Sequence, residues 1–193
     1  LHKKGFEAEG LGYGWSWDDY EATYMAERSF MPMYGNVVTF YDSNGIKSNP
    51  PLFQKLITST FDVSDGSKGF NVSRKLARNE FAITPSKNNK PKDLTFSTLQ
   101  NNGNESLDLA CNLLSDALQK QVFRGGNFDS KLGTKIYSQP TDSMLKIMMH
   151  RSDNFFAEQS LLMTSYKKLG LLNEEKLIET LLKNELKDLP QKP

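Results

Sequence analysis

The sequence predicts an α+β fold in which the strands come first and the helices follow. Between Asn36 and Leu99, short runs of alternating apolar and polar residues have the period of two that is typical of strands with one buried face. From Asn104 onward, the apolar residues recur every three or four positions, which is the period of an amphipathic helix. Because the period changes at this point, we expect a strand-rich region followed by a mainly helical one.

Four segments of the first half are predicted strands. They cover residues 36–41, 71–76, 80–84 and 94–99. The Asp-Ser-Asn-Gly run at 42–45 is expected to end the first strand in a turn. The segment 52–61 is compatible with either a strand or a helix, and 85–92 is expected to be a polar loop with no side chains to bury.

The second half of the chain is predicted to be mainly helical. The first covers residues 105–121, and its apolar face comprises Leu107, Ala110, Cys111, Leu114, Ala117 and Leu118. A short strand is predicted at 134–138. A helix then starts at 140–142, with its buried face formed by Leu145, Met148 and Met149.

The last two predicted helices follow directly. One has the apolar stripe Phe155, Gln159, Leu162, Tyr166 and Leu169. Gly170 is expected to cap its C-terminus. The final helix carries Leu177, Ile178, Leu181, Leu182 and Leu186, and is expected to end at Leu189-Pro190.

The composition excludes several classes of function. The 193 residues include 24 Lys and Arg against 23 Asp and Glu, so the net charge of +1 offers no basic field for a nucleic-acid partner. The single cysteine, Cys111, excludes an internal disulfide framework. With only His2 and His150 beside it, a metal site rich in His or Cys is also excluded.

The tripeptide Ser152-Asp153-Asn154 stands between two apolar helical segments. It has the form of the S-D-N element of penicillin-recognising serine enzymes. Helices on both sides would hold a hydroxyl and an amide rigidly, which suits proton relay and substrate binding. Taken alone, however, the pattern favours the alternative in which Ser152 or Asp153 only caps the helix that begins near Phe155. A site would leave Ser152 and Asn154 exposed, whereas a mere cap would bury Asn154.

Two segments together resemble a known family. Residues 137–154, which include the tripeptide, resemble the S-D-N region of the D-alanyl-D-alanine carboxypeptidase/endopeptidase family, the class C low-molecular-mass penicillin-binding proteins. Residues 12–20, Gly-Tyr-Gly-Trp-Ser-Trp-Asp-Asp-Tyr, resemble the family's G-x-G-W-x-W-D-D signature and lie upstream, as in the family. The resemblance implies an inserted α+β region over residues 1–136, with strands to about residue 100, and a helical segment of the penicillin-binding, transpeptidase-like catalytic domain over 137–193.

The resemblance also implies roles for individual residues. Ser152 would pass a proton towards the leaving amine, and the Asn154 amide would hold the substrate's backbone carbonyl. Asp19 would bind the free amino group of the diamino acid in the peptidoglycan stem peptide. Without the resemblance, Asp19 and its neighbour Asp18 would be interpreted as a turn or capping pair. Asp153 receives no catalytic role, and no metal or organic cofactor is implied.

The chain departs from the family's pattern at two boxes. The family acylates a serine in an S-x-x-K box near its N-terminus and uses a K-T-G strand near its C-terminus. The S-x-x-K strings at 143–146 and 165–168 stand in the wrong place relative to Ser152 and are interpreted as surface turns of helices, and no K-[ST]-G string occurs. We therefore expect a middle segment of such an enzyme that is inactive by itself, with β-lactams acylating a serine outside it.

These observations predict a fragment of a serine-type D-Ala-D-Ala carboxypeptidase/endopeptidase that acts on peptidoglycan stem peptides in the periplasm or cell envelope. One alternative is a non-catalytic module for cell-envelope binding or scaffolding, in which Ser152-Asp153-Asn154 is only a cap. A second is an intracellular protein–protein interaction module, which the neutral charge and the amphipathic helices equally allow.

Overall fold

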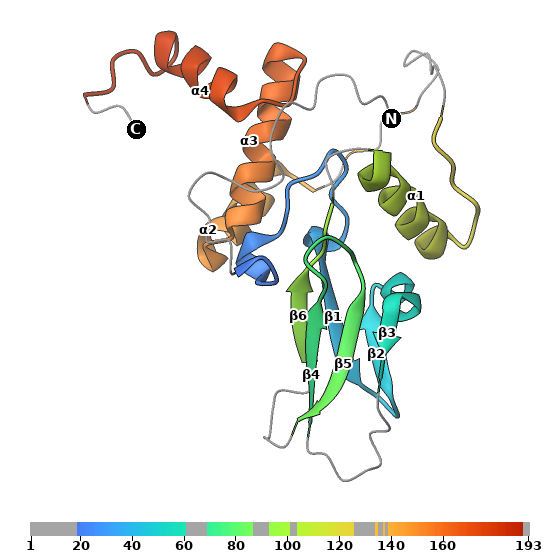
Figure 1. The fold of residues 1–193 in the computed structure, drawn as a ribbon. Helices are drawn as coiled ribbons and strands as arrows, with labels where there is room; N and C mark the ends of the chain where they lie inside the picture. Colours follow the sequence, from blue (N-terminus) through green and yellow to red (C-terminus); the bar gives the residue numbers. More distant parts are fainter. Residues whose placement is uncertain are drawn as a thin grey trace.

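The computed structural model describes residues 19–60, 69–86, 93–100, 104–125, 134, 137 and 139–190. The strands of this part are β1 (Val37–Asp42), β2 (Ile46–Asn49), β3 (Ile57–Ser59), β4 (Gly69–Arg74), β5 (Phe81–Ser86) and β6 (Asp93–Ser97). Its α-helices are α1 (Asn104–Leu118), α2 (Thr141–Arg151), α3 (Asn154–Leu169) and α4 (Glu174–Lys183). The strands therefore precede the helices, and the α+β prediction is confirmed (Figure 1).

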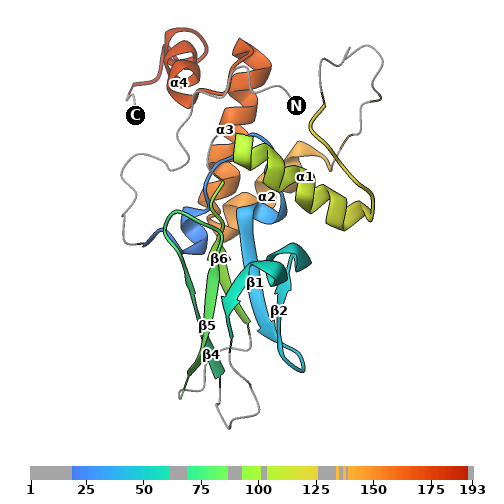
Figure 2. The same cartoon turned by 45° about the vertical axis from the view of Figure 1, so that its right-hand side comes forward.

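The strands form two three-stranded sheets. In the first, β1 is central and pairs antiparallel with β2 and with β6. In the second, β5 is central, antiparallel to β4 and parallel to β3. The predicted turn at 42–45 joins β1 to β2, with the Gly45 N–H donating to Asp42 Oδ1 at 3.2 Å. Both views place the sheets on one side of the molecule and α3 and α4 on the other (Figures 1 and 2).

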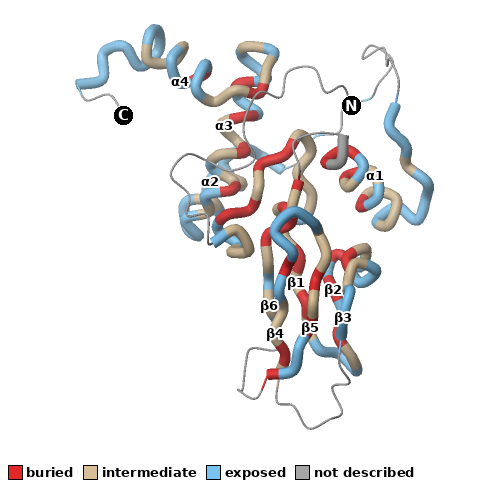
Figure 3. Tube along the Cα trace, viewed as in Figure 1, coloured by how far each residue is buried: buried red, intermediate tan, exposed pale blue. Residues whose placement is uncertain are grey.

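Aromatic side chains join the two sheets into one core. Phe40 of β1 and Phe81 of β5 are fully buried, and their ring centroids lie 4.9 Å apart. Phe53, from the 3-10 helix Pro51–Leu56, meets Phe81 edge-on at 5.9 Å. Leu113 of α1 belongs to the same buried cluster. The alternation read from the sequence thus places one face of each sheet inside, with α1 packed against that core (Figure 3).

A buried amide ties the segment before β1 to α3. Gln159 of α3 accepts from the Ser29 N–H at 3.3 Å and donates to the Ser29 carbonyl at 3.0 Å. Asn36, just before β1, donates to Ser29 Oγ at 2.9 Å and to the Glu27 carbonyl at 2.7 Å. Because these groups are buried or half-buried and paired, they fix the start of β1 relative to α3.

An ion-pair cluster strengthens the same connection. The Arg28 guanidinium is buried, its Nη1 lies 2.5 Å from Glu174 Oε1, and its Nε lies 3.6 Å from Glu158 Oε2. Glu158 belongs to α3 and Glu174 begins α4. One side chain from the strand-rich part therefore contacts both of these helices. The division into 1–136 and 137–193 stays a prediction, and these contacts cross it.

Several predicted strand boundaries need correction. Thr134 and Tyr137 belong to no strand, and Tyr137 is 84% exposed, so the predicted strand at 134–138 is wrong where the structure describes it; no described strand pairs with these residues. β5 continues through Pro85 to the buried Ser86, because both pair with β4, so the predicted loop at 85–92 starts too early. Residues 87–92 lie outside the described part.

The ambiguous segment at 52–61 divides into two elements. The 3-10 helix ends at Leu56 and β3 follows directly. The helix predicted over 105–121 ends at Leu118, where Gln119 adopts a positive φ of 52°. Cys111 on its apolar face is only half-buried, and Leu118 is 58% exposed.

The predicted buried face of α2 is wrong. Leu145 is 37% exposed and Met149 is 73% exposed, and no residue of α2 is buried. Met148, the third residue of that face, is half-buried, so the described part of the structure covers this side of the helix incompletely. α3 ends as predicted at Gly170, which has a φ of 75°. Tyr166 of its stripe is exposed, and α4 ends at Lys183, before the predicted Leu189.

No helix among the described residues is both long and apolar enough to cross a membrane.

Candidate functional site

The Ser152-Asp153-Asn154 tripeptide forms the junction between α2 and α3. Ser152 caps the end of α2 in the left-handed region, with φ 50° and ψ 48°. Asp153 is the N-cap of α3, and its Oδ1 accepts from the Phe156 N–H at 2.9 Å. The Asp153 N–H in turn donates to the Met148 carbonyl at 3.0 Å. The chain therefore changes direction within two residues.

The sequence allowed two interpretations of this tripeptide, a substrate site and a helix cap, and each agrees with part of the structure. Asp153 is the cap, as the cap alternative allowed. Ser152 and Asn154 are both exposed, as expected of side chains that meet a substrate. Because Asp153 satisfies the helix terminus, the serine hydroxyl and the asparagine amide are not needed for capping.

A cavity of about 450 Å³ opens beside this junction. On the helical side it is lined by residues 151–156, and on the other side by Thr23, Tyr24, Tyr34, Gly35, Val37 and Thr95. The two walls come from segments that the contacts of Ser29 and Arg28 hold together. The exposed polar groups of Ser152 and Asn154 thus lie in a cavity with a partly aromatic wall.

Asp19 is linked to the same cavity through a tyrosine. Its carboxylate is exposed and accepts a hydrogen bond from the Tyr24 hydroxyl. This bond raises the pKa of Tyr24 above its ordinary value. Tyr24 lines the cavity, whereas Asp19 does not line it directly. Residues 12–18 of the predicted motif, which include Trp15 and Trp17, lie outside the described residues.

Tyr24 and Tyr34 were missed by the sequence analysis. Tyr24 follows Asp19 by five positions and lies in the 3-10 helix Thr23–Met25, which is too short for any periodicity to identify it. The Gly35-Asn36 pair predicts a turn after Tyr34, but the sequence does not reveal that this turn faces α3. Both tyrosines join the site through long-range packing.

The two S-x-x-K strings differ in their surroundings. Ser143 is exposed on the first turn of α2, in agreement with the prediction of a surface turn. Ser165 is fully buried, which contradicts that prediction. Its hydroxyl contacts the carbonyls of Leu171 and Asn173 at 2.9 and 2.8 Å. Ser165 therefore holds the end of α3 against the start of α4.

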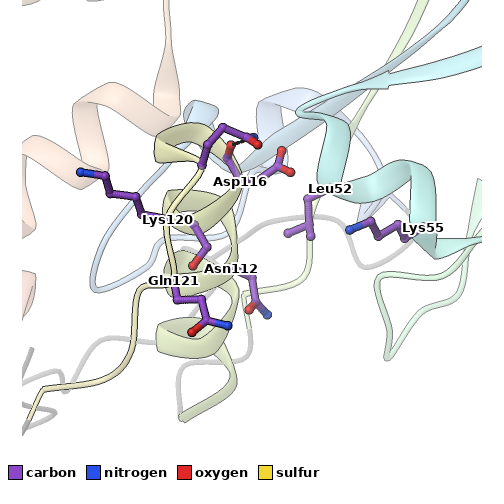
Figure 4. Close-up of a pocket in the computed structure, with 8 residues that line it drawn as sticks. Leu52, Lys55, Asn112, Asp116, Lys120 and Gln121 are labelled. Carbon is purple, nitrogen blue, oxygen red and sulfur yellow. Dashed lines mark hydrogen bonds between the residues drawn. The ribbon is translucent and has the colours of Figure 1, made fainter.

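Other hollows lie away from the junction. One of about 370 Å³ separates Leu52 and Lys55 from Asn112 and Asp116 of α1 (Figure 4). A neighbouring one of about 620 Å³ shares Asn112 with it. None of the predicted site residues lines either. Among the residues that the structure describes, no three His, Cys, Asp or Glu side chains are grouped to hold a metal ion.

Comparison with known proteins gives a similarity of fold. No protein-family model and no curated protein matches the chain. The crystal structure of penicillin binding protein 4 (dacB) from Haemophilus influenzae matches with a TM-score of 0.57 and 18% sequence identity. The match covers 96% of this chain and 44% of that one, so the chain spans less than half of that protein's length. At this identity the match establishes the fold alone, which is that of part of a penicillin-binding protein.

Proposed function

We propose that this chain is part of a serine-type D-Ala-D-Ala carboxypeptidase/endopeptidase that acts on peptidoglycan stem peptides in the periplasm or cell envelope. The observation that carries the proposal is that one sequence motif lines the cavity and that Asp19, a residue of the other motif, is hydrogen-bonded to a side chain that lines it. Ser152 and Asn154 line it, and Asp19 is bonded to Tyr24 of its opposite wall. The similarity of fold to a penicillin-binding protein supports the same conclusion.

In the proposed reaction, the nucleophile is a serine outside this chain, and this chain supplies the groups that transfer a proton and bind the substrate. That serine gives its proton to a lysine that also lies outside this chain and attacks the substrate carbonyl, and β-lactams acylate the same serine. The Ser152 hydroxyl passes a proton to the leaving amine, a role worth about 10²–10⁴ in rate. The Asn154 amide binds the peptide backbone, and the Asp19 carboxylate, oriented by Tyr24, binds the substrate's ammonium group. Asp153 holds the junction by capping α3.

Two substitutions test the site in the full-length protein that carries this segment. Ser152→Ala and Asn154→Ala should each lower kcat/KM for a D-Ala-D-Ala peptide by at least about tenfold, because each removes a polar group that acts on the substrate. Neither should change Tm appreciably, since both side chains are exposed. Steady-state kinetics and thermal unfolding measure the two effects.

Asp153→Ala is the matched control from the same tripeptide. It removes the hydrogen bond to the Phe156 N–H and should cost about 1 kcal/mol of stability. If Ser152→Ala and Asn154→Ala instead lower Tm and keep the specific activity, the tripeptide serves only as a cap. A non-catalytic envelope module would then be the better description.

The 193-residue chain itself should form no covalent adduct with labelled penicillin. The physical reason is that acylation needs an activated serine, and the S-x-x-K strings here offer none in the family's setting. Intact-mass spectrometry of the purified chain after incubation measures the adduct, with the full-length protein as the positive control. A stoichiometric adduct on the chain would mean that the nucleophile lies within it.

A further inference from the structure

Two neighbouring hollows form a groove along α1, called the α1 groove below. Their volumes of about 370 and 620 Å³ lie within the range of ligand-binding pockets. Three residues line both hollows: Asn112, Ser115 and Gln121. The 3-10 helix Pro51–Leu56 contributes to the first hollow, and Phe123 lines the second. Residues 151–156 line neither, so the groove is separate from the cavity at the α2–α3 junction.

The core and Ser115 hold the walls of the α1 groove in place. Leu113 anchors α1, and Phe53 anchors the 3-10 helix, in the same buried cluster. After α1 the chain turns back, and Ser115 Oγ accepts from the Val122 N–H at 2.9 Å. This bond holds segment 121–123 beside the helix. Because the walls are fixed before a ligand arrives, binding there needs little ordering of the protein.

Two opposite charges approach the first hollow without pairing. Figure 4 shows the Asp116 carboxylate and the Lys55 amino group directed towards Leu52 from opposite sides. No ion pair joins these two described residues. The next charged pair along α1 is closed, since Arg124 Nε lies 2.5 Å from Asp108 Oδ1. Asp116 and Lys55 therefore keep their hydrogen-bonding capacity for a ligand that enters between them.

The side chains of the groove fit a chain rich in hydroxyl and amide groups. A carboxylate only accepts hydrogen bonds, an ammonium only donates them, and the carboxamides of Asn112 and Gln121 do both. Adjacent hydroxyls of a sugar ring also donate and accept, and an acetamido substituent pairs with a carboxamide in the same way. The ring of Phe123 is 75% exposed and offers an apolar surface for the C–H face of a sugar.

We propose that the α1 groove binds a saccharide chain of N-acetylated amino sugars, the chemistry of the glycan strands of peptidoglycan. The site takes no part in the reaction, and only the choice of this glycan as the natural polymer rests on the proposed function. Asp116 and Lys55 bind ring hydroxyls, the two carboxamides bind acetamido groups, and Phe123 packs against one ring face. Binding there keeps the protein on the polymer that carries the stem peptides.

The test is a titration of the full-length protein with the β-1,4-linked tetramer of N-acetylglucosamine, which contains no peptide. Calorimetry should give saturable binding with a Kd of about 1 mM or lower. Cellotetraose has hydroxyls in place of the acetamido groups and should bind at least about tenfold more weakly, because the carboxamides lose their partners. Absence of saturable binding of the first tetramer at about 10 mM, or equal binding of both, would overturn the proposal.

Two substitutions locate the saccharide in the α1 groove. Asp116→Asn and Phe123→Ala should each raise the Kd about three- to tenfold, the effect of one lost polar or aromatic contact. Asp142→Asn in α2 and Tyr166→Ala in α3 change exposed residues outside the groove and should leave the Kd unchanged. Equal effects of the groove variants and these controls would contradict the assignment. Since the probe contains no peptide, the result is independent of the kinetic effect of Ser152→Ala, on which the proposed function depends.

Discussion

Replacing Phe81 by alanine is expected to destabilise the protein by about 3–5 kcal/mol, the range for removing a fully buried phenylalanine. The ring lies between Phe40 of the first sheet and Phe53 of the 3-10 helix. Its loss leaves a cavity where three elements meet, and the backbone of β5, paired on both sides, cannot move to fill it. Urea unfolding monitored by circular dichroism measures the change in the free energy of unfolding.

Two further variants provide a scale for this loss of stability. Phe81→Leu keeps most of the apolar volume and should cost no more than about 1.5 kcal/mol. Leu76→Ala, in the turn before β5, removes a side chain that is 45% exposed and should stay within about 0.5 kcal/mol of the wild type. If Phe81→Ala were as mild as Leu76→Ala, the two sheets would not share the core described above.

Glu174→Gln is expected to cost about 2 kcal/mol, because it removes one of the two carboxylates that compensate the buried Arg28 charge and leaves only Glu158, at 3.6 Å, of that pair. Glutamine preserves the size and the hydrogen-bonding oxygen but removes the negative charge that lies 2.5 Å from the Arg28 guanidinium. Arg28 has a side chain that is 4% exposed, so water cannot replace the lost charge. Thermal and urea unfolding should show the loss together with loosening of α4.

A double variant identifies the source of that cost. Arg28→Met combined with Glu174→Gln removes both charges and should be more stable than Glu174→Gln alone. Lys183→Gln, which removes a charge from an exposed pair with Glu179, is the control and should be nearly neutral. If the double variant lost the sum of the two single effects, the contact with Glu174 would not be a coupled ion pair.

The predictable parts of the fold are those encoded by local sequence. The turn at 42–45 and the cap at Gly170 follow from residues that tolerate a positive φ. The alternation of Val38 and Phe40 gives both the strand and its buried face. By contrast, the exposed apolar face of α2 could not be predicted, because periodicity identifies an apolar side but not whether a partner covers it.

In the candidate site, too, features set by local sequence could be predicted, whereas features set by long-range contacts could not. The exposed position of Ser152 and Asn154 at a helix junction could be predicted, because both belong to one motif between two periodic segments. Their approach to Tyr24 and Tyr34 depends on Gln159 and Arg28, buried polar residues whose partners are more than a hundred positions away in the chain. A sequence pattern contains no sign of such pairing. The sequence assigns Asp153 no catalytic role, but only the three-dimensional structure shows that Asp153 rather than Ser152 caps α3.

The position of the tripeptide gives the junction a mechanical property. Ser152 ends one helix and Asn154 begins the next, so the hydroxyl and the amide are attached to different helices with only Asp153 between them. Any change in the angle between α2 and α3 therefore changes the gap between these two groups. A ligand that bridges the two groups would therefore oppose a change in that angle.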